Sequence, residues 1–308
     1  MADLALRPLS LGELLDRAFT IFRTRFGTIL LVLLACLVLP ALMLLNNFRG
    51  MMELAQLGPT AANSPESARM IFAVVGKMIW VGLIAAVALT VARTALGWIA
   101  HKAMLGDSTD VGSALGKGLK LFLPMIGLLI VEAVIFVIVE VVLYLPMIFL
   151  GLGAAAAGGR GGAGVGLGLM LWMVVIAVAM LYLVAALFVS SATLIAEADT
   201  GVFKAIERSW TLTKGRRGTI MGAIVLVYLL VWIVMLGVSF GVGIVAGVGG
   251  SGPEGVGRVM TLMMGGMMLL GLLVSGYYYM LQMVTYYDLR VRKEGLDLEL
   301  ASAEMPPA

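Results

Sequence analysis

The sequence predicts an all-α membrane protein that crosses the bilayer six times. The chain of 308 residues is 61% hydrophobic and 13% charged, and its mean hydropathy is +1.07. An average soluble domain is about 25% charged. Six long apolar runs follow one another along the chain, and a charged segment occurs twice, once before the first run and once before the fifth. A chain this apolar cannot bury its hydrophobic surface in water, so the class is integral membrane protein.

Each apolar run is long enough for one transmembrane helix, which needs about 20 residues. The runs cover residues 27–46, 71–100, 120–150, 165–196, 219–248 and 258–288. Lipid offers the backbone no hydrogen-bond partners, and the alternating pattern of barrel strands is absent, so the runs are predicted to be helices. We expect one membrane domain over residues 1–308, in which 289–308 is a tail.

The repeated segment predicts how these helices are grouped. Glu13–Leu30 reads ELLDRAFTIFRTRFGTIL, and residues 204–221 read KAIERSWTLTKGRRGTIM. Charged and apolar residues alternate in both copies with the period of an amphipathic helix, which predicts interfacial helices over 9–26 and 200–214. Residues 111–119 resemble the same pattern weakly. The chain is therefore expected to form three hairpins, each preceded by an amphipathic helix.

The distribution of Lys and Arg predicts the orientation. With the N-terminus inside, 16 of the 21 basic residues fall on the inner side of the six helices. The positive-inside rule then places both termini in the cytoplasm. The net charge of +3 is explained by these basic inner loops, and no nucleic-acid partner is expected.

Three short stretches carry a resemblance to a known family. They read RPLSLGELLDRAF near the start, EADTGVFKAIERSWTLTKG before the fifth helix and YYDLRVRKEGLDLEL at the end. The chain resembles the bacterial membrane-domain family named for glycerophosphoryl diester phosphodiesterase, and the similar six-helix YciC-like proteins. The resemblance implies a multi-pass protein of the bacterial inner membrane. It also implies the membrane partner of a separately encoded phosphodiesterase, since no catalytic barrel is present in this sequence.

The sequence predicts no enzyme site, no metal site and no cofactor. A metal-dependent phosphodiesterase needs several His, Asp and Glu residues around one ion. The chain has one histidine, His101, which we interpret as an interfacial residue beside Lys102. Its one cysteine, Cys36, lies in an apolar run and is expected to be a packing residue.

Four charged residues fall inside predicted helices, where charge is costly and needs a partner or a water-filled cavity. They are Lys77, Arg93, Glu132 and Glu140. Helices two and three run in opposite directions, so Lys77 is expected at the level of Glu140, and Arg93 at the level of Glu132. Two interpretations remain open: ion pairs that lock one hairpin, or a polar pathway for a proton, ion or solute.

A second set of charged residues is predicted on the cytoplasmic side, where it either contacts lipid headgroups or ties helix ends together. The set is Arg17, Arg25, Arg208, Arg216, Arg217, Asp288 and Arg290. Glu197, Asp199 and Asp288 are candidates to pair with Arg216, Arg217 or Arg290.

The function predicted first is a non-enzymatic scaffold or accessory subunit. It contacts membrane lipids, and it has a protein partner or a second copy of itself. The alternatives are a small-solute or ion permease through helices two and three, and the phosphodiesterase partner implied by the resemblance.

Overall fold

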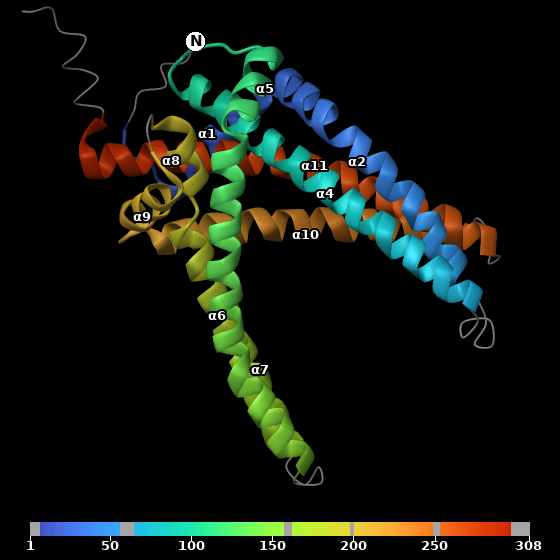
Figure 1. Cartoon of the computed structure of the whole chain (residues 1–308). Coiled ribbons are helices and arrows are strands. Elements are labelled where there is room, and N and C mark those ends of the chain that lie inside the picture. The colour runs from blue at the N-terminus through green and yellow to red at the C-terminus, as the bar shows by residue number, and fades with distance from the viewer. Residues whose placement is uncertain (1–6, 56–64, 157–161, 198–199, 249–252, 297–308) are drawn as a thin grey trace, which may run out of the picture. The chain divides into compact units, whose positions relative to one another are not determined.

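The computed structural model describes residues 7–55, 65–156, 162–197, 200–248 and 253–296. These residues form ten α-helices and no strand (Figure 1). The helices are α1 (Leu11–Thr24), α2 (Phe26–Ala55), α4 (Pro65–Met104), α5 (Val111–Lys120), α6 (Phe122–Ala156), α7 (Gly162–Ala186), α8 (Ser190–Ala196), α9 (Val202–Thr213), α10 (Arg217–Val248) and α11 (Pro253–Glu294).

Within the described ranges, six segments are long and apolar enough to cross a membrane, which confirms the predicted class. They are Phe26–Asn47, Ser67–Met104, Phe122–Leu152, Gly166–Ala196, Arg217–Gly241 and Gly265–Glu294. Much of their surface is exposed hydrocarbon: Leu123 is 77% exposed, Met170 71% and Phe240 72%. Exposed apolar area on this scale is typical of a surface that faces lipid.

Several helices are longer than predicted. The first span was expected to end at residue 46, but α2 continues to Ala55. The sixth was expected over 258–288, but α11 runs from Pro253 to Glu294. A helix does not have to stop where its apolar run stops, because its polar ends can continue into water. α4 begins at Pro65, and at the first position of a helix the missing N–H of proline costs nothing.

The fourth span differs from the prediction because it is broken. Residues 165–196 were expected to form one helix, but α7 ends at Ala186 and α8 begins at Ser190. The break leaves the buried Ala186 carbonyl without a donor from its own helix, and it accepts hydrogen bonds from the hydroxyls of Ser209 (2.9 Å) and Thr213 (3.2 Å) on α9. Side chains from another helix thus replace the backbone donors that the break removes.

The chain divides into two compact units. Unit 1 contains residues 1–14, 123–225 and 285–308, and unit 2 contains residues 15–122 and 226–284. In unit 2, α2 and α5 both pack against α4. In unit 1, α8 packs against α9 (Figure 1). Trp172 on α7 donates its indole N–H to the Leu143 carbonyl on α6 at 2.7 Å.

Three short helices directly precede long ones. One residue separates α1 from α2 and α5 from α6, and three separate α9 from α10. The seventh residue of each short helix is basic: Arg17, Lys117 and Arg208. A capping box begins α1, since the Ser10 N–H donates to Glu13 Oε2 at 2.7 Å and the Glu13 N–H to Ser10 Oγ at 3.4 Å. The bonds from Ser10, with the charge of Arg7, lower the pKa of Glu13 to about 2.

Candidate functional site

Basic side chains gather around one indole at the end of α4. His101 stacks on Trp98 with the ring centroids 5.0 Å apart, and Lys102 places its Nζ 5.4 Å from the Trp98 centroid. Lys117 from α5 lies closer, with its Nζ 4.6 Å from the same ring. The attraction of ammonium groups for the π face of tryptophan holds both lysines beside it. We call Arg25, Trp98, His101, Lys102 and Lys117 the basic cluster.

The turn after α4 brings Arg25 to this cluster. Gly106 has a φ of +79°, which a side chain would strain, and the turn lets the Asp107 N–H return to the Lys102 carbonyl at 2.9 Å. The Asp107 carboxylate then pairs with Lys102 Nζ at 2.9 Å. Arg25 donates from Nη2 to the Asp107 carbonyl at 3.0 Å. One short loop thereby fixes two of the cationic side chains.

Helix α5 positions the third cation, Lys117. Asp110 caps its N-terminus by accepting from the backbone N–H groups of Gly112 (3.0 Å) and Ser113 (3.3 Å). The hydrogen bonds from Ser113 are the main reason that the pKa of Asp110 is lowered. Gly118 is buried against α4, where a Cβ at this position would lie 2.9 Å from the Val91 carbonyl oxygen. This close approach brings Lys117 over Trp98.

The basic cluster is suited to binding an anion. Arg25, Lys102 and Lys117 bring three basic side chains together, and Lys102 already pairs with Asp107. The Asp110 carboxylate is directed to the first turn of α5. Fixed ammonium and guanidinium groups beside an aromatic ring match a phosphate at a membrane surface.

A second cluster of charged and polar residues lies in unit 1, and its charged members form ion pairs with one another. Arg208 on α9 donates to Glu197 Oε1 at 3.0 Å and to Glu294 Oε1 at 2.5 Å. Tyr286 donates its hydroxyl to Glu197 at 2.9 Å, and Arg290 Nε contacts Glu294 at 2.8 Å. Partial burial alone lowers the pKa of Arg208, but its bonds to Glu294 and Glu197 raise the pKa on balance. We call these five residues the Arg208 network.

Asp288 ties the N-terminal segment to α11. Its buried carboxylate accepts from the Leu9 N–H at 2.7 Å and from Arg292 Nε at 3.0 Å. Arg292 also donates to the Leu9 carbonyl at 2.6 Å. Of the two roles predicted for Asp288, these contacts favour the structural one.

The predicted partners of the acidic residues differ from those in the structure. Glu197 pairs with Arg208, and Asp288 pairs with Arg292, rather than with Arg216, Arg217 or Arg290. Asp199 lies outside the described residues. Arg217 is buried against Trp210 and Tyr182, 4.0 and 4.8 Å from their ring centroids, and these contacts favour a structural role. Arg17 and Arg216 are half-buried.

The four charges inside the helices fall in different units. Glu132 in unit 1 accepts a hydrogen bond from the Ser190 hydroxyl at the break in the fourth span. Glu140 is exposed on α6. In unit 2, Lys77 is exposed on α4 and Arg93 is half-buried. The predicted pairing of Lys77 with Glu140, and of Arg93 with Glu132, stays a prediction.

Sequence reasoning missed how the basic cluster assembles. From the sequence, His101 was interpreted as an interfacial residue beside Lys102, and neither residue was connected with Trp98. Their spacing of three and four residues places all three on one face of α4, and this signal was readable. The contribution of Lys117 depends on the packing of Gly118 against α4, which no local pattern reveals.

In the part of the chain that the structure describes, no group of three or more His, Cys, Asp or Glu side chains is arranged to hold a metal ion. No known protein family, no curated protein and no solved structure matches this chain.

Proposed function

We propose that the protein is a non-enzymatic, multi-pass membrane protein that acts as a scaffold or accessory subunit and contacts anionic lipid headgroups through the basic cluster. One observation carries the proposal: Lys102 and Lys117 both place their ammonium groups over the indole ring of Trp98. Arg25 is held nearby by its hydrogen bond to the Asp107 carbonyl. Two ammonium groups and one guanidinium group, each held in place, supply what a phosphate-bearing headgroup needs.

The expected setting is a bacterial inner membrane with both termini in the cytoplasm. The support for this orientation is the excess of Lys and Arg on that side, and the three cations of the basic cluster belong to this excess. The three-hairpin repeat is supported by the three short helices before long ones, each with a basic seventh residue. In this arrangement α1, α5 and α9 are amphipathic helices at the inner surface.

Replacing Lys117 by Gln is expected to weaken binding of an anionic lipid about fivefold, since each well-placed basic residue contributes about 1 kcal/mol at a membrane surface. Anisotropy of a fluorescent phosphatidylglycerol, titrated with the full chain in detergent, measures the affinity. Lys120→Gln is the matched control because Lys120 is exposed on the same helix. The control is expected to change the affinity less than twofold. If both variants lost affinity equally, lipid binding would depend on the overall positive charge and not on a specific site at Lys117.

A permease is the second candidate, and one observation favours it. Glu132 meets the Ser190 hydroxyl at the point where the fourth span breaks. Broken helices beside a carboxylate are the sites where many transporters bind ions and substrates. The Ser209 and Thr213 hydroxyls on the Ala186 carbonyl explain the break as a stable structural feature, so we rank this function second.

On the permease hypothesis, Glu132→Gln abolishes proton-coupled flux in liposomes without lowering expression, because a glutamine cannot carry a proton. Glu140→Gln serves as the comparison, since Glu140 is on the same helix and exposed. A pH-sensitive dye inside the liposomes records the flux. Unchanged flux in Glu132→Gln, or no flux through the parent protein, would eliminate this candidate.

A further inference from the structure

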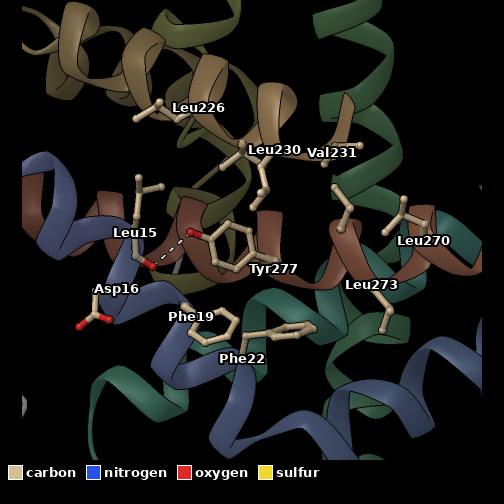
Figure 2. A pocket seen from close by; sticks show the side chains of 12 residues that line it. Leu15, Asp16, Phe19, Phe22, Leu226, Leu230, Val231, Leu270, Leu273 and Tyr277 are labelled. Atoms are coloured by element: carbon tan, nitrogen blue, oxygen red, sulfur yellow. Dashed lines mark hydrogen bonds between the residues drawn. The ribbon is translucent and has the colours of Figure 1, made fainter. Parts of the chain in front are cut away.

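Unit 2 contains an apolar groove of about 650 Å³ between α1, α10 and α11 (Figure 2). Ten of its 12 lining side chains are hydrocarbon only, and the other two are Asp16 and Tyr277. A volume of this size lies within the range of ligand pockets, about 300–1,000 Å³, and such pockets combine apolar walls with a few polar groups. None of the lining residues belongs to the basic cluster, so the groove is an independent site.

The polar groups of the groove lie at one end, beside α1. Tyr277 donates its hydroxyl to the Leu15 carbonyl at 3.1 Å and thereby satisfies its own polar group (Figure 2). Phe22 packs edge-on against the Tyr277 ring with the centroids 6.3 Å apart, which fixes the wall at this end. The Asp16 carboxylate is exposed and remains the one charge among the lining side chains.

The rest of the groove faces hydrocarbon. Its walls on α10 and α11 fall inside candidate membrane spans, and Leu226, Leu230 and Leu273 remain 45%, 64% and 36% exposed. A bilayer offers lipid tails to such a surface. The acidic end selects among lipids, because a headgroup with only negative charge would meet the Asp16 carboxylate as a like charge, whereas an amine would be attracted.

We propose that this groove binds a bilayer lipid with an amine headgroup, the tail along Leu226, Leu230 and Leu273 and the ammonium beside Asp16. The groove is lined by hydrocarbon along most of its length and has a carboxylate at one end. An amphiphilic molecule with a cationic group matches both parts. The wall is preformed by the Phe22–Tyr277 contact and the Tyr277–Leu15 hydrogen bond, so little ordering is needed on binding.

Photo-crosslinking in nanodiscs tests the proposal with the full chain. One probe is a phosphatidylethanolamine with a diazirine at the tail end, and the other is the matching phosphatidylglycerol. The ethanolamine probe is expected to label the α10 and α11 residues of the groove about two- to fivefold more than the glycerol probe, the range of an exposed ionic contact. Asp16→Asn is expected to bring this ratio to about one.

Groove-filling variants separate specific binding from general lipid contact. Val231→Trp and Leu273→Trp each place an indole in the groove and are expected to remove its labelling. Leu229→Trp is the matched control because Leu229 is exposed on α10 and does not line the groove. Lys117→Gln is expected to leave the labelling unchanged, so failure here and failure of the headgroup proposal can be told apart. Thermal melting of each variant verifies folding.

Three results would overturn the proposal. Equal labelling by the two lipids in the parent protein would remove the role of Asp16. Labelling that persists in both folded tryptophan variants would place the tail elsewhere. A protein segment crosslinked into the groove in place of lipid would identify it as a helix-docking surface.

Discussion

Replacing Arg208 by Ala is expected to lower the free energy of unfolding by about 2–3 kcal/mol. Breaking a buried ion pair by removing one partner costs about 3–5 kcal/mol, because the remaining charge is left without compensation. Here the side chains of Arg208, Glu197 and Glu294 are 30%, 18% and 22% exposed, so water reduces the penalty. Unfolding in mixed micelles, followed by circular dichroism, measures the change.

One further variant separates the two-pronged geometry of the Arg208 guanidinium from its charge, and a second serves as the control. Arg208→Lys keeps the charge but offers one ammonium to two carboxylates, so we expect about half of the loss. Lys204→Ala, at an exposed position on the same helix, is expected to stay within about 0.5 kcal/mol of the parent. A loss in Lys204→Ala equal to that in Arg208→Ala would show that the network is not the cause.

Replacing Gly118 by Ala is expected to cost about 1–3 kcal/mol, the range for overpacking a close contact. The new Cβ would meet the Val91 carbonyl oxygen at 2.9 Å, and backbone cannot move aside as a flexible side chain can. Gly116→Ala is the matched control, since nothing lies within 4 Å of a Cβ there. On an interior helix position Ala is otherwise preferred to Gly, so the control should be neutral or slightly stabilising.

The same pair of glycine variants connects packing to the proposed function. Because α5 must move away from α4 in Gly118→Ala, Lys117 loses its place over Trp98, and affinity for phosphatidylglycerol should fall with stability. Gly116→Ala should keep both. A stable Gly118→Ala protein with parental lipid affinity would contradict the positioning of Lys117 by this contact.

The sequence was sufficient to predict the class and the number of candidate spans. The length of an apolar segment is a local property of the sequence, and it can be compared directly with the thickness of the bilayer. Helix starts were also readable where the residue chemistry is local, as at Pro65 and at the Ser10–Glu13 capping box. The break after Ala186 was not readable, because the residues that stabilise it, Ser209 and Thr213, lie on another helix.

The candidate site was also predictable only in part, because local sequence shows which residues are charged but not which residues they contact. Charge counts placed Arg25, Arg208 and Asp288 together among the residues that contact headgroups or tie helix ends. The partners of the last two depend on tertiary packing: Arg208 joins Glu197 to Glu294, and Asp288 accepts from the backbone of Leu9. A pattern within one segment carries no information about such long-range contacts.

The hydrogen bonds on the Ala186 carbonyl also have a consequence for the order in which the protein folds during its synthesis. A ribosome releases α7 and α8 before α9, so the fourth span emerges without the Ser209 and Thr213 hydroxyls that its break requires. In lipid an unsatisfied carbonyl costs several kcal/mol. The nascent span therefore has to remain an unbroken helix, or keep this end in water, until α9 has been translated and can dock.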